Sequence, residues 1–369
     1  FDNKTGIWSG SEKEKKRISE LEKEEPGSFE YIYSSEDVFS KEISLSSEIN
    51  ISDPINNLSW EMSSLNYQNF LGNIYLPGVN NIFLKEKIGK NKFSTPKIIS
   101  SPLVFKNDII FTDNNGTIFS VNQSGEINWK KNIYRKIYKK IYKSLVFSIY
   151  QNSLYIADNI GFIYSVNLKN GKLNWIKNHG IPLKSNIKIF EDKIFLINQD
   201  NRLLAFNTKD GSMFWNVRSV KSFIKIQNFL SLALSNQGDL IALDTSGNLT
   251  KIDSTNGQVY WSLNTTGSTL AHAADFFKSS NVVISNSSII FSTYNSIFSY
   301  NLNNGYTNWR TEVSSIGTPI VDKNYIFLVT ENGYFVILEK NTGEIVSSTY
   351  IFKILKKRKR STKVTGFVM

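Results

Sequence analysis

Few residues of this 369-residue chain combine the types and the spacing that catalysis or metal binding requires. His179 and His272 are its only histidines, and neither has a second histidine or a carboxylate at metal-ligand spacing, so both are interpreted as hydrogen-bonded loop residues. Cysteine is absent, which excludes disulfides, thiolate zinc sites, iron–sulfur clusters and cysteine nucleophiles. The short motifs of common hydrolases, nucleotide-binding enzymes and metalloproteases are also missing. The sequence therefore predicts no catalytic residue, no metal site and no bound cofactor.

One segment has an unusual charge pattern. Lys130–Lys143 reads KKNIYRKIYKKIYK, with seven basic residues, no acidic residue and an Ile-Tyr pair every four residues. We interpret it as the exposed edge of a sheet, where lysine discourages pairing with another sheet. Contact with an anionic membrane surface is a second interpretation, and nucleic-acid binding is the least favoured. Basic residues gather again in 354–363, where we expect a solvated loop.

The composition is that of a folded globular chain. Lys and Arg number 43 against 32 Asp and Glu, for a net charge of +11, and 40% of the residues are hydrophobic, which excludes bulk disorder. The 25 Phe, 17 Tyr and 7 Trp favour strands. Because no run approaches 18 apolar residues, no helix is expected to span a bilayer.

One pattern recurs six times along the chain. Each copy contains two apolar strands joined by an Asn/Asp/Gly turn, followed by Asn or Asp, a glycine and a tryptophan. The turn glycines, spaced 38 to 48 residues apart, are Gly125, Gly171, Gly211, Gly257, Gly305 and Gly343. Four residues after the first five of them stand Trp129, Trp175, Trp215, Trp261 and Trp309, with Ser347 in the sixth place. A period of about 40–50 residues fits a four-stranded propeller blade.

These repeats predict an all-β fold. Their apolar residues form short blocks of Ile, Phe, Tyr and Val without a helical stripe, and the Asn-Gly and Asp-Gly pairs suit tight hairpins. Since a single four-stranded sheet cannot bury both of its faces, the blades are expected to stack around an axis. Each tryptophan is then predicted to cover the gap to the neighbouring blade, so the repeated tryptophans and turn glycines are candidate blade-docking residues. Ser347 would give a weaker anchor.

The Asn/Asp-x-x-x-Gly-x-x-x-Trp units between Ile109 and Ser347 resemble the repeats of the PQQ-like β-propeller superfamily. In size and layout the chain is similar to the outer-membrane assembly factors of the BamB family. That resemblance implies a parent protein of eight blades, of which six to six and a half are present here. Residues 1–40 are expected to form a flexible charged lead, and 41–369 a propeller that is incomplete at its C-terminal end. Trp60 is expected in an incomplete first blade, and Lys363–Met369 in the opening strand of a seventh.

The resemblance implies two competing kinds of function. Quinoprotein dehydrogenases hold PQQ and Ca²⁺ on the axis of such a propeller, but they are longer and carry a Cys-Cys pair that this chain lacks. Members of the BamB family are non-catalytic scaffolds, lipid-anchored at the periplasmic face of the outer membrane, that dock on the POTRA domains of the barrel insertase BamA. We therefore expect a monomeric subunit of the barrel assembly machinery, without a cofactor or enzyme activity. A ligand-binding propeller of another kind remains an alternative.

The same resemblance suggests which residues contact the partner. Ile224 and Ile226 stand where the family has a Leu-x-Leu-Arg pattern, and Gln227 replaces its arginine. Asp275 matches the first residue of an Asp-x-Asp pair whose second position is Phe277 here. These candidate partner-binding residues follow the third and fourth repeated tryptophans. A competing interpretation makes the two isoleucines plain inward-facing strand residues.

Overall fold

The computed structural model describes residues 39–76, 82, 84–86, 88–89, 101–218, 230–265, 279–293, 295–315, 317–354, 364 and 367–369. All of them belong to one compact unit, Phe39–Met369. Residues 1–38 lie outside the described part, so the flexible lead expected over 1–40 stays a prediction.

The described residues form six four-stranded antiparallel sheets, each built from four consecutive strands. We number these blades 1 to 6 in chain order. Blade 1 holds β1 (Leu103–Phe105), β2 (Asp108–Thr112), β3 (Thr117–Val121) and β4 (Ile127–Asn132), and blade 2 holds β5 (Leu145–Tyr150), β6 (Ser153–Asp158), β7 (Phe162–Asn167) and β8 (Leu173–Asn178). Blade 3 holds β9 (Lys188–Phe190), β10 (Lys193–Ile197), β11 (Arg202–Asn207) and β12 (Met213–Arg218), and blade 4 holds β13 (Ser231–Leu234), β14 (Asp239–Leu243), β15 (Asn248–Asp253) and β16 (Val259–Asn264). Blade 5 holds β17 (Val283–Ser285), β18 (Ser288–Ser292), β19 (Ile297–Asn301) and β20 (Thr307–Thr311), and blade 6 holds β21 (Ile320–Asp322), β22 (Tyr325–Val329), β23 (Tyr334–Glu339) and β24 (Ile345–Tyr350).

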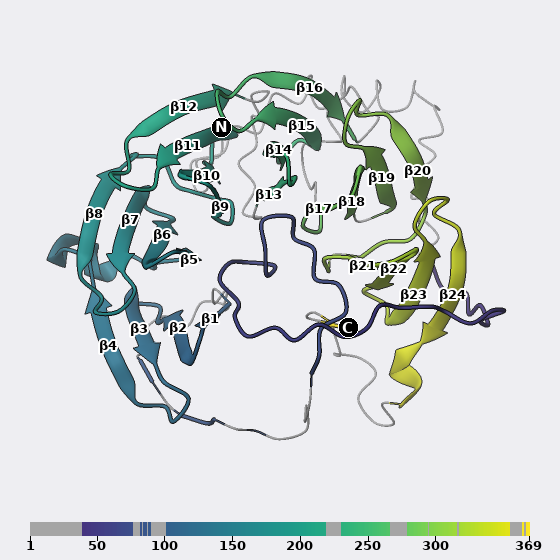
Figure 1. The fold of residues 1–369 in the computed structure, drawn as a ribbon, viewed down its shortest axis with the longest axis horizontal. Coiled ribbons are helices and arrows are strands. Elements are labelled where there is room, and N and C mark those ends of the chain that lie inside the picture. Colours follow the sequence, from purple (N-terminus) through teal and green to yellow (C-terminus); the bar gives the residue numbers. More distant parts are fainter. Residues whose placement is uncertain are drawn as a thin grey trace, which may run out of the picture. The chain divides into compact units, whose positions relative to one another are not determined.

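The blades are arranged around an axis, with the first strand of each sheet nearest to the centre and the fourth on the outside (Figure 1). This confirms the predicted all-β propeller of four-stranded blades. Two 3-10 helices, η1 (Lys136–Lys140) and η2 (Ile351–Ile354), follow the outer strands of blades 1 and 6. No helix in the described ranges has the length and apolar character needed to cross a membrane.

The hydrophobic core is a series of layers between neighbouring blades. Inner and middle strands such as β5 and β14 are buried almost throughout, whereas outer strands such as β4 and β12 expose most of their residues. One cluster joins blades 1 and 2 through Ile118 and Ile156, and another joins blades 5 and 6 through Val283 and Val336. Neighbouring sheets therefore bury their facing surfaces against each other, as the repeat pattern predicts.

The residues at the recurring spacing of each repeat form the hairpin between the third and fourth strands. In blade 2, the Asn167 side-chain oxygen accepts the N–H of Lys169 at 3.0 Å, and its carbonyl accepts the N–H of Gly171 at 2.9 Å. Gly171 has φ +68°, a conformation that residues with a Cβ rarely adopt. An Asn or Asp three to four residues before a glycine thus closes this loop and turns the chain back towards the outer strand.

One expectation about the ends of the propeller is wrong. Trp60 lies in no blade: it makes an isolated antiparallel bridge to Val104 of the innermost strand β1. A signal in the sequence marks this difference, because Asn56 stands four residues before Trp60 where a blade would have its turn glycine.

The opening strand of a seventh blade at Lys363–Met369 stays a prediction, because residues 363, 365 and 366 lie outside the described part. Within the described residues of this stretch, 364 and 367–369, there is no strand. The Met369 carbonyl instead accepts the N–H of Ile74 at 2.8 Å, and Phe367 packs against the cluster around Ile320.

Candidate partner-binding surface

The repeated tryptophans lie at the junctions between blades. Each indole N–H donates to a backbone carbonyl in the next blade. The carbonyl always belongs to the residue that follows the Asn, Asp or Glu at the start of that blade's third-to-fourth hairpin. The five pairs are Trp129 with Leu168, Trp175 with Thr208, Trp215 with Ser254, Trp261 with Leu302 and Trp309 with Lys340, at 2.8–3.3 Å.

Each of these indoles also lies against the turn glycine of the next blade. A Cβ on Gly171 would come within 2.6 Å of Trp129 Cε3, and the same approach occurs at Gly211, Gly257, Gly305 and Gly343. The glycine is therefore needed both for its positive φ and for the space that the indole occupies. The spacing of Gly and Trp in the sequence couples each blade to the next one.

The two end blades are covered differently. Among the described residues no blade precedes blade 1, and its turn glycine, Gly125, is contacted by Leu84 and Glu86. At the other end, Ile43 pairs with Ser348 of the outer strand β24 through two backbone hydrogen bonds of 2.9 and 3.0 Å. Ser347, which replaces the tryptophan, donates its hydroxyl to the Ile43 carbonyl at 3.1 Å. Residues before blade 1 thus cover surfaces that neighbouring blades cover elsewhere.

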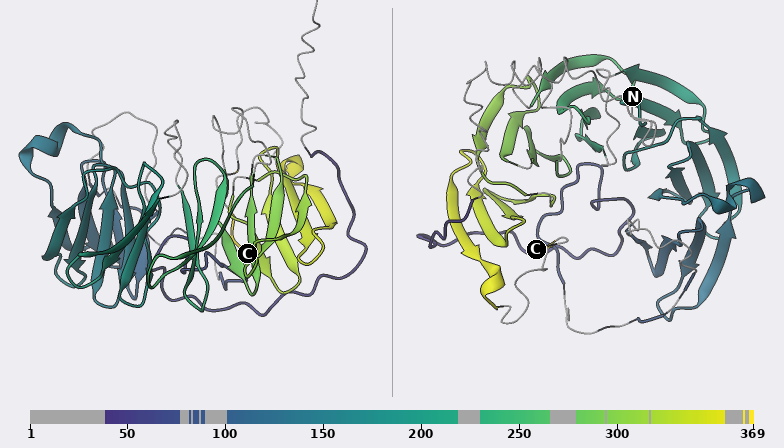
Figure 2. Two further views of the ribbon diagram at one scale, coloured as in Figure 1. Left: turned by 90° about the horizontal axis from the view of Figure 1, so that it is seen from above. Right: turned by 180° about the vertical axis from the view of Figure 1, so that it is seen from behind.

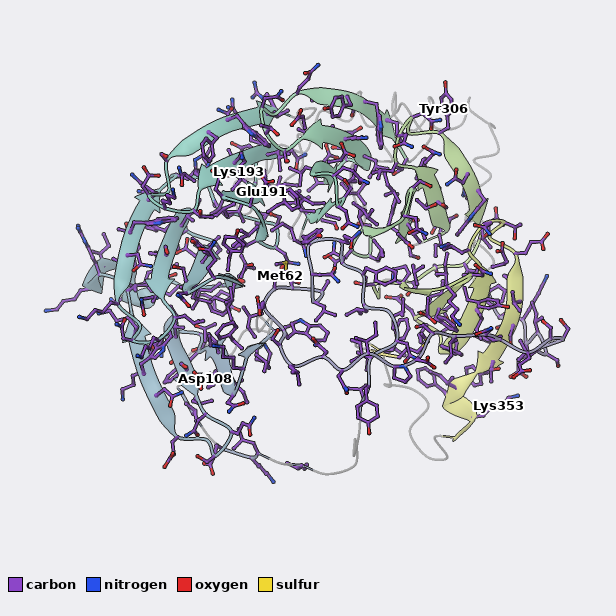
Figure 3. The ribbon with its side chains drawn as sticks, viewed as in Figure 1. Met62, Asp108, Glu191, Lys193, Tyr306 and Lys353 are labelled. Carbon is purple, nitrogen blue, oxygen red and sulfur yellow. The ribbon has the colours of Figure 1, made fainter. Side chains whose placement is uncertain are left out.

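Residues 52–74, which we call the axial segment, fill the centre of the ring. Figure 1 shows this part of the chain inside the circle of inner strands, and Figure 3 shows Met62 near its middle. Backbone groups of the segment pair with inner strands of four blades: Trp60 with Val104, Met62 with Ser148, Tyr67 with Leu234 and Gln68 with Ile284. Ser52 adds blade 6, because its N–H donates to Asp322 at 2.7 Å.

Two buried polar side chains hold the axial segment. Lys188 of β9 is 0% exposed, and its amine donates to the carbonyls of Ser63 and Asn66, both at 2.8 Å. Burial lowers the pKa of Lys188 to about 7. Asn69 is 1% exposed and donates to the carbonyls of Leu232 and Val282 at 2.9 and 2.7 Å, which joins blades 4 and 5.

The sequence analysis missed both of these residues. Lys188 leaves a weak signal, since it is a lysine between the apolar residues Ile187 and Ile189. Asn69 leaves none, because its neighbours show neither helical nor strand periodicity.

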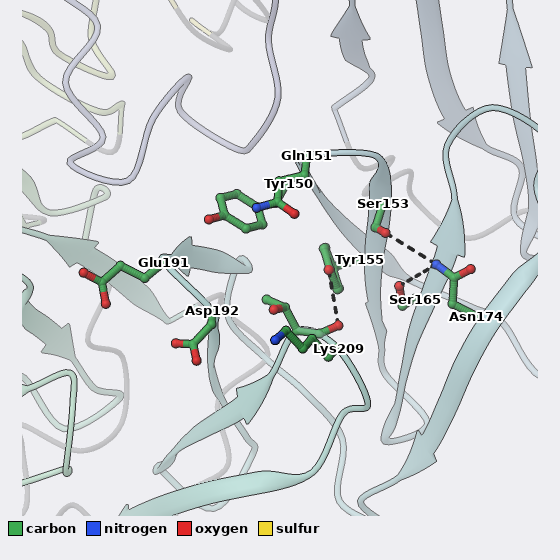
Figure 4. A pocket seen from close by; sticks show the side chains of 10 residues that line it. Tyr150, Gln151, Ser153, Tyr155, Ser165, Asn174, Glu191, Asp192 and Lys209 are labelled. Atoms are coloured by element: carbon green, nitrogen blue, oxygen red, sulfur yellow. Dashed lines mark hydrogen bonds between the residues drawn. The ribbon is translucent and has the colours of Figure 1, made fainter.

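A polar cavity of about 550 Å³ lies between blades 2 and 3 (Figure 4). Its lining includes Tyr155, Glu191, Asp192 and Lys209. A hydrogen bond from Lys193 lowers the pKa of Asp192, so this carboxylate is ionised at neutral pH. Among the described residues, no three His, Asp or Glu side chains lie close enough together to hold a metal ion.

The predicted partner-binding residues lie outside the described part of the chain. Ile224, Ile226 and Gln227 fall in 219–229, between β12 and β13, and Asp275 falls in 266–278, between β16 and β17. His272 and residues 355–363 of the second basic cluster are outside it as well. The structure does give the topology of these connections, because the strands on both sides of each are described.

Connections from the fourth strand of one blade to the first strand of the next all leave from one end of the propeller. The strands within a blade are antiparallel, so the second-to-third turns lie at this end too. A hydrogen bond from the Asn132 side chain to the Asn115 carbonyl links the two kinds of connection in blade 1. We call this the loop end, and the opposite end, which carries the third-to-fourth hairpins, the hairpin end. The described strands that flank the two predicted partner segments, β12 with β13 and β16 with β17, end or begin at the loop end.

His179 also lies at the loop end, in the connection from β8 to β9. Its Nε2 is 3.1 Å from the Asn198 side-chain nitrogen, and its ring packs edge-on to Phe206. Burial lowers the pKa of His179, so the ring is neutral at pH 7. This geometry agrees with a hydrogen-bonded loop residue.

Comparison with known proteins gives the family. A family model described as "Outer membrane protein assembly factor BamB" matches residues 114–349, which run from the turn before β3 in blade 1 to β24 in blade 6. The chain belongs to the BamB family. The curated BamB of Moranella endobia (strain PCIT) is 24% identical over 197 residues, or 52% of this chain and 50% of that protein. BamB of Yersinia pestis is 22% identical over 194 residues, or 52% and 49%.

These matches span about half the length of the two BamB relatives. The crystal structure of BamB from Moraxella catarrhalis is similar with a TM-score of 0.59 and 12% identity, over 69% of this chain and 75% of that one. At that identity the similarity shows the propeller fold alone. Membership of the BamB family associates the chain with outer-membrane protein assembly.

Proposed function

We propose that this chain is a non-catalytic scaffold of the machinery that inserts β-barrel proteins into the outer membrane. It acts at the periplasmic face of that membrane, lipid-anchored in the full-length protein, and it binds the POTRA domains of a BamA-like insertase. The match of residues 114–349 to the BamB family carries this proposal.

The topology supports binding through the connections between blades. The described strands β12 and β16 end at the same end of the propeller, where β13 and β17 begin. Ile224, Ile226, Gln227 and Asp275 follow β12 and β16 in the sequence, about 50 residues apart, and our proposal is that they act together on one partner. Two neighbouring loops on rigid blades can form a continuous patch for a second protein.

The axial segment supports scaffolding over quinone chemistry. Related enzymes are expected to hold PQQ on the propeller axis, and in this chain the axis is occupied by residues 52–74. Lys188 and Asn69 bind the carbonyls of this segment and of the adjacent blades. A ligand on the axis would have to displace these buried contacts.

Affinity capture from a detergent extract of the native envelope tests the proposal. The unmodified chain should recover a POTRA-bearing barrel protein, and Ile224→Asp/Ile226→Asp should reduce that recovery at least tenfold. The control Ile127→Asp/Leu173→Asp makes the same changes at residues that are 44% and 42% exposed on the outer strands β4 and β8, and it should behave like the unmodified chain. Equal recovery by all three proteins would refute the loop assignment, and no recovery by any would refute the scaffold.

A further inference from the structure

The basic segment Lys130–Lys143 lies at the loop end, and the proposed partner site gives its exposed charges no role. Residues 133–144 connect β4 of blade 1 to β5 of blade 2 and contain η1. Figure 2 shows this connection as the blue coil that projects beyond the strands. The interpretation of this segment as an exposed sheet edge holds for Lys130 and Lys131, which are exposed on β4. It does not hold for the residues that follow, which leave the sheet.

Two tyrosine side chains of this segment contact blade 2 and hold the segment in place. Tyr134 donates its hydroxyl to Asp158 at 2.7 Å, and its ring lies 5.0 Å from the amine of the buried Lys143. Burial raises the pKa of Tyr134, so its hydroxyl keeps the proton that it donates. Tyr138 packs edge-on to Phe162, with ring centroids 5.6 Å apart.

The C-terminal side of the connection is fastened as well. The Asn159 side chain accepts the N–H of Ser144 at 2.8 Å and donates to the Tyr142 carbonyl at 3.2 Å. Contacts on both sides of η1 therefore hold it in one place on the blades.

Two of the three isoleucines of the segment, and three of its cations, are exposed to solvent. Ile137 is 73% exposed and Ile141 is 44% exposed, although the equivalent Ile133 packs against the core between blades 1 and 2. Arg135, Lys136 and Lys140 are exposed around them, and none of the three has an ion-pair partner in the described part of the chain. We call these five exposed residues the basic loop surface.

We propose that the basic loop surface docks on an anionic phospholipid membrane. No acidic residue occurs between Glu126 and Asp158, and Asp158 is buried and hydrogen-bonded, so this stretch presents positive charge alone. This turn projects from the blades and has single apolar side chains between cations, which suits the headgroup layer of a membrane. The isoleucines can reach the boundary between headgroups and acyl chains, while lysine and arginine stay at the lipid phosphates.

A cavity beside the loop adds a place for a headgroup. It has a volume of about 320 Å³, and its lining includes Arg135, Tyr138, Ile176 and Asn178. A guanidinium, a phenol and an amide are suited to a phosphate, and the aromatic and aliphatic walls suit the glycerol and upper acyl carbons. The inference is independent of the proposed POTRA partner, because it needs no second protein.

Sedimentation with large vesicles tests this inference on the complete 369-residue chain. Vesicles of phosphatidylcholine with about one third phosphatidylglycerol should bind the protein at low salt, and vesicles of pure phosphatidylcholine should not. Arg135→Ser/Lys136→Ser/Lys140→Ser should lower the partition coefficient about 100-fold, because each cation near an anionic surface contributes about a factor of five. Ile137→Ser should lower it several-fold without a change in charge.

A matched variant separates this surface from the overall positive charge. Lys169→Ser/Lys172→Ser/Lys209→Ser removes the same charge from exposed positions at the hairpin end. Its partition should stay within about twofold of that of the unmodified chain. Equal losses in the two triple variants, or absence of binding to anionic vesicles, would overturn the proposal. So would a labelled single-stranded oligonucleotide that binds through the same three cations and is not displaced by anionic vesicles.

Discussion

Replacing Trp309 with alanine should lower the free energy of unfolding by about 3–5 kcal/mol, the range for truncating a buried aromatic side chain. Trp309 is 8% exposed, donates its indole N–H to the Lys340 carbonyl at 2.8 Å and lies against Gly343. The substitution leaves a cavity between blades 5 and 6 and a carbonyl without its donor. Urea unfolding followed by circular dichroism, analysed by both midpoint and slope, measures the loss.

Tyr306→Ala is the matched control for this experiment. Tyr306 is three residues away in the same repeat and is 75% exposed, so its truncation should change stability by no more than about 0.5 kcal/mol. If the two variants unfold at the same urea concentration, the indole does not couple the blades. A shallower transition in Trp309→Ala alone would show that blade 6 has become a separate unfolding unit, which also agrees with a coupling role.

The stability of the chain should rise with pH above 7 because of Lys188, and Lys188→Met should remove that rise. Burial lowers the pKa of Lys188 from 10.5 to about 7, so between these values the unfolded chain binds a proton that the folded chain does not. Stability therefore increases with pH in this window by up to about 1.4 kcal/mol per pH unit, and below pH 7 the contribution is constant. The neutral amine still has two hydrogens for the carbonyls of Ser63 and Asn66.

The difference between the two proteins is the quantity to measure, because other titrating groups are common to both. From pH 7 to pH 10 the unmodified chain should gain up to about 4 kcal/mol relative to Lys188→Met. Lys172→Met, an exposed control on a hairpin, should follow the unmodified chain at every pH. Parallel curves for Lys188→Met and the unmodified chain would contradict the buried contact with the axial segment.

The blades could be predicted from the sequence because the contacts that form each blade involve residues at a fixed spacing within the repeat. Gly171 needs its positive φ in one hairpin, and Trp129 reaches that hairpin from the neighbouring blade, so a fixed spacing of the two residues recurs. In blade 6 the spacing is kept as far as Gly343, but the contact of Ser347 with Ile43 could not be predicted, because the sequence analysis expected a weak anchor to a neighbouring blade there.

The centre of the propeller could not be predicted in this way. The axial segment makes isolated bridges and single hydrogen bonds to strands that come up to 270 residues later, and such contacts leave no periodicity in the sequence. Trp60 was therefore assigned to a blade by its residue type alone. The assignment of Ile224 and Asp275 as partner-binding residues rests on resemblance alone, and both lie outside the described part of the chain.

Direct binding between the purified chain and a purified array of POTRA domains from a BamA-like insertase tests the scaffold proposal most directly. Biolayer interferometry should show saturable one-to-one binding. Ile224→Asp/Ile226→Asp should weaken it at least tenfold, or about 1.4 kcal/mol, and Ile127→Asp/Leu173→Asp should leave it unchanged. If a chain with the β-rich circular dichroism spectrum of a folded propeller shows no saturable binding to these domains, the proposed function is wrong.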